Sequence, residues 1–256
     1  MQGSDEADRS ANVLFEVKGN AAWITLNRPE LRNALDAATM KLLARRLREA
    51  EHAEVRCVVL TGSGGNFCGG GDVSVVRTQE DYHEYTANLA DACDAIAALT
   101  KPFITRVSGR ATAAGMAIVA LSDIAVATRD SVFGTPEISH GMFPMMAMGP
   151  IAAEIGRKAA WRLFYGGELI SGSDALSLGL VTEVSDDEAG LDRRVEAWIT
   201  RLAAADPRPL ALGRQLFHEL LDAPPSQAVR LGGKYVLRLL ALRQSAPPRA
   251  DYLVSK

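Results

Sequence analysis

The chain has 256 residues, of which 48% are hydrophobic and 23% are charged, and its formal net charge at pH 7 is −3. A chain of this length and composition can bury one large core, and its slightly acidic balance excludes the strongly basic character of nucleic-acid-binding domains. No uninterrupted apolar run approaches the roughly 18 residues that span a bilayer, so we expect neither nucleic acid nor a membrane as a partner.

The first elements are predicted to be a tail and a hairpin. Residues 1–11 are polar and acidic, which predicts a flexible N-terminal tail. Val13–Lys18 and Ala21–Leu26 then alternate apolar and polar residues around a Gly19-Asn20 turn. This pattern is typical of two antiparallel strands.

A helix and a buried strand follow. Asp36 is a good N-cap for an amphipathic helix that runs to His52, and Val55–Thr61 is rich in β-branched residues. A strand, a helix and a strand in this order predict parallel pairing. One face of the helix carries a basic stripe of Lys41, Arg45, Arg48 and His52. We interpret this stripe as a solvated face rather than an RNA-binding surface.

The loop from Gly62 to Asp72 is unusually rich in glycine. It lacks both the Gly-Lys-Ser/Thr ending of a phosphate-binding loop and the G-x-G-x-x-G spacing of a dinucleotide site. Glycine also allows the backbone to approach a bound carbonyl closely, and Phe67 and Cys68 are apolar residues that can anchor the loop. A second helix is predicted over Glu80–Leu99.

The stretch from Pro102 to Thr128 predicts a strand, a tight turn, a buried helix and another strand. Between Phe103–Val107 and Met116–Leu121 lie the small residues Ala111–Gly115. A helix that begins in such residues presents unpaired N–H groups that can stabilise an oxyanion. Taken alone, the stretch favours an ordinary close-packed strand–helix crossing.

The second half carries one conspicuous carboxylate and a methionine-rich segment. Glu137 lies in a loop after the short extended segment Ser131–Phe133, and Met142–Met148 is either the lining of an apolar ligand channel or core filler.

The remaining elements are predicted to be mostly helical. Before a break at Asp206-Pro207 they are the helices Arg157–Tyr165, Ser173–Leu178 and Leu191–Ala205 and the strand Val181–Val184. After it come the helices Leu210–Leu221 and Ser226–Leu242. A helical end of this kind often packs on a neighbouring subunit.

Several ordered motifs resemble one known family. They are WITLNRPELRNAL (Trp23 to Leu35), VRCVVLTGSGGNFCGGGD (Val55 to Asp72), KPFITRVSGRATAAG (Lys101 to Gly115), SDIAVAT (Ser122 to Thr128), FGTPEISHGMFP (Phe133 to Pro144) and ISGSDALSLGLVTEV (Ile170 to Val184). In their order and spacing they resemble the crotonase superfamily, the enoyl-CoA hydratases and isomerases, over most of the chain from about Val13 to about Leu242.

The resemblance implies an α/β fold built as a spiral of ββα units, with a C-terminal helical region that forms a trimer or a hexamer. It implies an acyl-CoA thioester as substrate, so coenzyme A is part of the substrate and no separate cofactor or metal is expected. On the motif positions, the backbone N–H groups of Gly71 and Ala114 form the oxyanion hole. An oxyanion hole stabilises the charge that builds on a thioester carbonyl as it becomes an enolate.

The resemblance also identifies the acids. Hydratases of the family carry two glutamates, and this chain has Ala117 at the position of the first and Glu137 at the second. Adding water uses two carboxylates, whereas moving a double bond needs one base that carries a proton between two carbons. A single Glu137 therefore favours an isomerase. The alternatives are a hydratase with one acid replaced, with His140 as an auxiliary group, and a catalytically silent acyl-CoA-binding subunit.

Six positions correspond to residues that border coenzyme A in the family: Arg32, Ala34, Gly69, Gly70, Asp72 and Val73. The family's usual C-terminal signature, with its Phe and its Lys-Arg-x-Pro ending, is absent. The chain ends in SAPPRADYLVSK instead. Contacts from the tail to coenzyme A are therefore not carried over.

The domain prediction has three parts: a tail over residues 1–11, a crotonase-like spiral core over 12–205 and a helical region over 206–256. The three cysteines, Cys57, Cys68 and Cys93, have no paired spacing, so neither a disulfide framework nor a zinc site is predicted. This cysteine usage favours the reducing cytoplasm.

Overall fold

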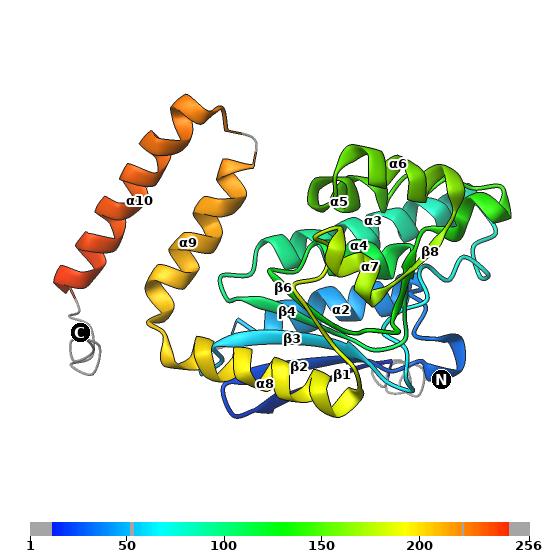
Figure 1. The fold of residues 1–256 in the computed structure, drawn as a ribbon, viewed down its shortest axis with the longest axis horizontal. Coiled ribbons are helices and arrows are strands. Elements are labelled where there is room, and N and C mark those ends of the chain that lie inside the picture. The colour runs from blue at the N-terminus through cyan, green and yellow to red at the C-terminus, as the bar shows by residue number, and fades with distance from the viewer. Residues whose placement is uncertain (1–11, 52–53, 222, 246–256) are drawn as a thin grey trace.

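The computed structural model describes residues 12–51, 54–221 and 223–245, and it is built around a six-stranded sheet (Figure 1). The first two strands pair antiparallel and the remaining neighbours pair parallel. In spatial order the strands are β1 (Val13–Lys18), β2 (Ala21–Leu26), β3 (Cys57–Gly62), β4 (Phe103–Val107), β6 (Ile124–Thr128) and β9 (Glu183–Ser185).

A second, three-stranded sheet consists of β5 (Arg110–Thr112), β7 (Val132–Gly134) and β8 (Leu169–Ser171). The chain passes from β4 in the large sheet to β5 in the small sheet and then into a helix, and β6 and β7 repeat this path. A bridge between Cys68 and Ala111 joins the glycine loop to the edge of the small sheet. These repeats form the predicted spiral of ββα units.

Helices cover both faces of the large sheet (Figure 1). Val58 and Leu60 of β3 belong to the core on the side of α2 and α3, whereas Cys57 and Val59 pack against α8. The prediction that this strand is buried on both faces is confirmed. The helices of the body are α2 (Ala37–Glu49), α3 (Gln79–Ala97), α4 (Ala114–Ala120), α5 (Met148–Glu154), α6 (Arg157–Gly166), α7 (Gly172–Ser177) and α8 (Glu188–Ala204).

The last two helices, α9 (Pro207–Leu220) and α10 (Pro225–Ser245), lie side by side and stand beside the α/β body (Figure 1). Asp206 accepts a hydrogen bond from Arg208 N and caps α9. Arg214 links α9 to the body, because its guanidinium donates to the carboxylate of Asp123 at 2.8 Å, and Leu210 packs against the core beside α8. None of the helices in the described ranges is both long and apolar enough to cross a membrane.

The structure corrects several predicted boundaries. The predicted hairpin is confirmed, with Lys18 opposite Ala21, and the buried helix begins at Ala114, within the small-residue segment as predicted. However, β3 begins at Cys57 instead of Val55, and β9 spans Glu183–Ser185 instead of Val181–Val184. Five short elements were not predicted: β5, β8, α5 and the 3₁₀ helices η1 (Pro29–Leu31) and η2 (Pro136–His140). The predicted tail over residues 1–11 and His52 of the basic stripe lie outside the described residues.

Candidate active site

A cavity of about 540 Å³ lies where the glycine loop, the start of α4, one face of α3 and the segment 136–147 meet. It brings together seven of the predicted site residues, namely Arg32, Gly69, Gly71, Val73, Ala114, Glu137 and His140. The other three, Ala34, Gly70 and Asp72, do not line the cavity.

The backbone N–H of Gly71 is left without a partner by the way its loop pairs with Leu35. Leu35 N donates to Gly70 O at 2.8 Å, and Asp72 N donates back to Leu35 O at 2.8 Å. In such a parallel bridge the residues on either side of Gly71 make the hydrogen bonds. Within the described part of the chain, the Gly71 N–H has no acceptor and remains available at the cavity wall.

The N–H of Ala114 is available for a different reason. Ala114 is the first residue of α4, and the first N–H groups of a helix have no partner within it. The preceding residue, Ala113, has φ 52° and ψ −120°, and its N–H donates to Gly134 O at 2.9 Å. A non-glycine residue held in such a conformation costs about 1–3 kcal/mol, so the surrounding structure imposes this turn.

The two N–H groups belong to segments that pack directly on one another. Cys68 N donates to Arg110 O at 2.8 Å, and the Thr112 hydroxyl donates to Gly69 O at 3.0 Å. A Cβ placed on Gly70 would lie 2.8 Å from the Cβ of Ala113. Only glycine allows this approach, so the glycine loop and the start of α4 form one wall of the cavity.

Glu137 is the only carboxylate among the described residues that line the cavity. It lies in the first turn of η2, and its Oε2 is buried with no hydrogen-bond partner in the described residues. Burial raises the pKa of Glu137 above its usual value, against the opposing effects of its own backbone N–H and of His140. Ala117 lies deeper in α4, is 4% exposed and does not line the cavity.

His140 ends η2 and is exposed at the cavity wall, three residues after Glu137. Gly141 follows it with φ 73°, and this left-handed turn reverses the chain so that Met142 N donates to Glu137 O at 3.0 Å. The turn holds Glu137 and the methionine-rich segment on the same cavity. An auxiliary role for His140 stays a prediction.

Two of the predicted residues that do not line the cavity, Ala34 and Asp72, are joined by hydrogen bonds to Arg28. The guanidinium of Arg28 donates to Ala34 O at 2.6 Å and to the Asp72 carboxylate at 3.2 Å. Burial opposes ionisation of Asp72, but hydrogen bonds from Ser74 and Arg28 hold the pKa of this carboxyl below its usual value. Contacts from Ala34, Gly70 or Asp72 to coenzyme A stay predictions.

The methionine-rich segment lies at the cavity. Met142, Phe143, Pro144, Met145 and Met146 line the cavity, so of the two interpretations of this segment the structure favours an apolar channel.

Other lining residues were not predicted. One face of α3 reaches the cavity with i, i+3, i+4 and i+7 spacing, through Tyr82, Tyr85, Thr86 and Leu89. This spacing is visible in the sequence and could have identified them. Arg110 adds a second guanidinium beside that of Arg32.

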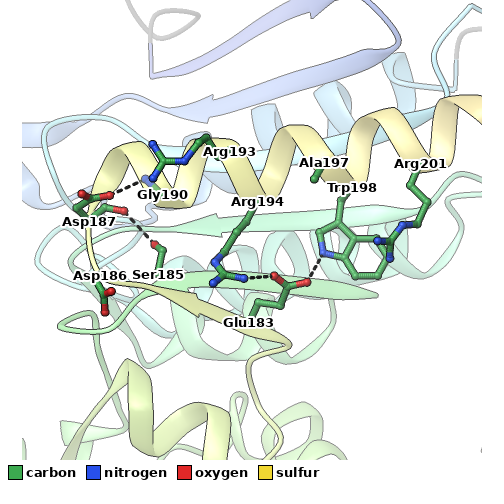
Figure 2. A pocket seen from close by; sticks show the side chains of 10 residues that line it. All are labelled: Glu183, Ser185, Asp186, Asp187, Gly190, Arg193, Arg194, Ala197, Trp198 and Arg201. Atoms are coloured by element: carbon green, nitrogen blue, oxygen red, sulfur yellow. Dashed lines mark hydrogen bonds and ion pairs between the residues drawn. The ribbon is translucent and has the colours of Figure 1, made fainter.

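A second cavity, of about 410 Å³, lies between β9 and α8 and shares no lining residue with the first (Figure 2). Several of its polar side chains bond to one another. Glu183 accepts hydrogen bonds from Arg194 at 2.7 Å and from Trp198 at 3.0 Å, and Arg201 stacks over the Trp198 ring. Figure 2 shows Glu183 bridging Arg194 and Trp198, and we assign no chemistry to this cavity.

Comparison with known proteins gives the family. The Enoyl-CoA hydratase/isomerase family matches residues 16–232. Enoyl-CoA hydratase domain-containing protein 3, mitochondrial, of Rattus norvegicus is 31% identical over 228 residues, which cover 86% of this chain and 74% of that protein. Among solved structures, an enoyl-CoA hydratase of Mycobacterium smegmatis superposes with a TM-score of 0.86 at 34% identity, with 92% of each chain covered.

The human enoyl Coenzyme A hydratase domain-containing protein 3 superposes with a TM-score of 0.87 at 28% identity, covering 91% of this chain and 93% of that one. The family match spans the glycine loop, the start of α4 and η2, which are the three segments that build the cavity around Gly71, Ala114 and Glu137. The chain therefore belongs to the enoyl-CoA hydratase/isomerase family of the crotonase superfamily.

Proposed function

We propose that this protein is an enoyl-CoA isomerase that moves a double bond in an acyl-CoA thioester with one glutamate as the proton carrier. The observation that carries the proposal is that Glu137 is the only carboxylate among the described residues lining the cavity, while Ala117 occupies the position where hydratases of the family carry a second one. One base is sufficient for isomerisation, whereas syn hydration uses two carboxylates to hold and deprotonate a water.

In the proposed reaction, the thioester carbonyl of a 3-enoyl-CoA accepts hydrogen bonds from the N–H groups of Gly71 and Ala114. The ionised carboxylate of Glu137 removes a proton from the α carbon, and the electron pair moves into a dienolate whose charge lies largely on the thioester oxygen. The two N–H groups stabilise that charge. Protonated Glu137 then returns the proton to the γ carbon, which leaves the double bond between the α and β carbons.

Two alternatives remain on the same site. A hydratase with one acid replaced would need His140 or another group to help hold the water. A silent acyl-CoA-binding subunit would need only the thioester site. The unpartnered Oε2 of Glu137 favours an active enzyme over the silent subunit, because a buried carboxylate without a partner destabilises a fold that makes no use of it.

We also propose the wider setting. Arg32, Gly69 and Val73 contact coenzyme A, supported by their place on the cavity wall. The protein forms a homotrimer or a hexamer through α9 and α10, supported by the exposed apolar side chains on these helices. A role in fatty acid metabolism is supported by the family's acyl-CoA substrates. A reducing compartment such as the cytoplasm is supported by the three free cysteines.

The test compares two reactions in heavy water, followed by absorbance and NMR: isomerisation of a 3-enoyl-CoA and hydration of a 2-enoyl-CoA. We expect the wild type to isomerise faster than it hydrates. Glu137→Gln keeps the shape of the side chain and removes the base, so it abolishes isomerisation while CoA-ester binding stays nearly intact. Ala117→Glu adds a carboxyl at the position of the second acid and should raise hydration, provided that Met116 and the cavity wall accommodate the larger side chain.

Hydration by the wild type at ordinary enzyme rates, unchanged in Glu137→Gln, would contradict the single-acid mechanism. Absence of both reactions with intact ester binding would instead support the silent subunit.

A further inference from the structure

The hydroxyl of Tyr85, a residue of α3, lies directly against Gly71 of the proposed oxyanion hole. The Tyr85 side chain is 6% exposed and lines the cavity. A Cβ placed on Gly71 would lie 1.7 Å from the Tyr85 hydroxyl oxygen and 3.0 Å from the ring carbon that bears it. The hydroxyl therefore occupies the space that any other residue at position 71 would fill with its side chain.

No residue in the described ranges accepts or donates a hydrogen bond at the Tyr85 hydroxyl. A buried tyrosine hydroxyl usually finds a partner. Tyr235 does so in this same protein, where a side chain that is 7% exposed donates to Glu219 at 2.5 Å. Tyr85 and Glu137 thus bring a donor and an acceptor to the same cavity. Glu137 Oε2 is buried without a partner among the described residues, and the Tyr85 hydroxyl makes no hydrogen bond to a described residue.

Tyr85 keeps its proton near neutral pH. Burial raises the pKa of its hydroxyl, and the neighbouring groups Cys68 and Asp72 raise it further. Asp72 is itself held by Arg28 and Ser74 and does not line the cavity. The group beside Gly71 is therefore a neutral O–H donor, which is suited to an oxygen that gains negative charge.

We propose that Tyr85 is a further catalytic residue, whose hydroxyl donates a hydrogen bond to the bound acyl thioester next to Gly71 and strengthens the hold on its enolate oxygen. The proposal rests on the proposed function, because it takes the N–H groups of Gly71 and Ala114 as the oxyanion hole. It adds a side-chain donor to the two backbone donors. It also explains glycine at position 71, because a larger residue would displace this hydroxyl.

The test uses acetoacetyl-CoA, whose enolate absorbs ultraviolet light, and butyryl-CoA, which stays a neutral ester. Both are titrated against the wild type and Tyr85→Phe, which keeps the ring and removes the hydroxyl. We expect Tyr85→Phe to bind the enolate roughly 10- to 100-fold more weakly, as for loss of a hydrogen bond to a charged group. Binding of butyryl-CoA should fall less than about fivefold, as for a neutral hydrogen bond.

Tyr165→Phe is the matched control. Tyr165 is 67% exposed on α6 and does not line the cavity, so the loss of its hydroxyl should change neither titration. The thermal midpoint of each variant shows that it is folded.

A second pair of variants tests the contact itself. Gly71→Ala places a methyl group against the Tyr85 hydroxyl, so it should weaken ester binding less in the Tyr85→Phe background than in the wild type. Equal effects in both backgrounds would overturn the proposal.

The outcomes separate the two proposals. Equal enolate binding by the wild type and Tyr85→Phe would overturn the role of Tyr85 and leave the oxyanion hole standing. Equal losses for the enolate and the neutral ester would also overturn it, because they indicate a packing role. Failure of the wild type to bind either ester would overturn the proposed function and this inference together.

Discussion

The side chain of Glu137 is ionisable, and one of its carboxylate oxygens is buried with no partner among the described residues. This arrangement makes the stability of the fold depend on pH. Because burial raises the pKa of Glu137, the folded state keeps its proton over a pH range in which the unfolded chain has lost it. The stability contributed by the protonated form is complete below the unfolded pKa of about 4.3. It is lost as the pH rises through the folded pKa.

We therefore expect Glu137→Gln to unfold at a higher urea concentration than the wild type at neutral pH, because the variant never ionises there. The gain should vanish below about pH 4, where the wild-type carboxyl is protonated in both states. Glu16→Gln, at a strand residue whose side chain is 62% exposed, is the control and should change the midpoint little at either pH. A gain of equal size at both pH values would show that ionisation of Glu137 is not its cause.

Gly115 of α4 packs closely against the glycine loop. A Cβ placed there would lie 2.5 Å from Cys68 O and 2.8 Å from Cys68 Cβ, so Gly115→Ala forces the two segments apart. We expect a loss of about 1–3 kcal/mol in unfolding free energy, as for an overpacked core, measured by chemical denaturation.

Gly149→Ala in α5 is its counterpart, because nothing lies within 4 Å of an added Cβ. This change should be neutral or stabilise by up to about 1 kcal/mol. Equal effects of the two substitutions would contradict the close contact at Gly115.

At the scale of elements, Arg214 makes polar contacts between α9 and the body, and Leu210 of α9 packs against the core beside α8. Arg214 has a side chain that is 6% exposed and pairs with Asp123. Its two terminal nitrogens donate to backbone carbonyls at and beyond the end of α3: Ile96, Ala97 and Leu99.

We expect Arg214→Ala to cost about 3–5 kcal/mol in unfolding free energy, because it removes the guanidinium from a partly buried carboxylate and from several backbone carbonyls. Arg129→Ala removes an exposed pair with Asp186 and should cost less than about 1 kcal/mol. Urea unfolding of both variants checks the difference. Similar losses for the two would mean that Arg214 does not anchor α9.

The elements also show how far the sequence alone could lead. The hairpin of β1 and β2 and the long helices were predicted because alternation and helical spacing extend over many residues. β5 and β8 have three residues each, which is too short for either period to appear. They exist because neighbours distant in the sequence pair with them.

The site residues also divide into those that local motifs predict and those that depend on contacts between distant segments. The motif positions predicted Gly71, Ala114 and Glu137, which the structure places on one cavity. The reason that Gly71 N–H is free, its pairing through Leu35, depends on a long-range bridge that no local pattern encodes. Tyr85 was hidden for a related reason, because a helix face toward a cavity has the same spacing as a face toward a core.

For the whole molecule, α9 and α10 leave large apolar side chains exposed. Those on α9 are Phe217 and its C-cap neighbour Leu221, and those on α10 include Val236, Leu237 and Leu240, each at least 47% exposed. Exposed apolar surface of this kind marks an interface. We expect light scattering to give a trimer or a hexamer at micromolar concentration.

The double variant Phe217→Asp with Leu237→Asp should shift that mass toward the monomer, whereas Gln227→Asp, at an exposed polar position on α10, should not. A monomeric wild type would contradict the proposed assembly. A mass that the double variant leaves unchanged would place the interface elsewhere.

The link made by Arg214 also sets an order of events during synthesis. Asp123 and the carbonyls at the end of α3 leave the ribosome long before α9 does, because Arg214 lies far downstream in the chain. Until α9 emerges, these groups lack their hydrogen bonds to the Arg214 guanidinium, so the contact between α9 and the nascent α/β body cannot form. Folding from the N-terminus, as is general for domains, therefore stays incomplete here until most of the polypeptide has been translated.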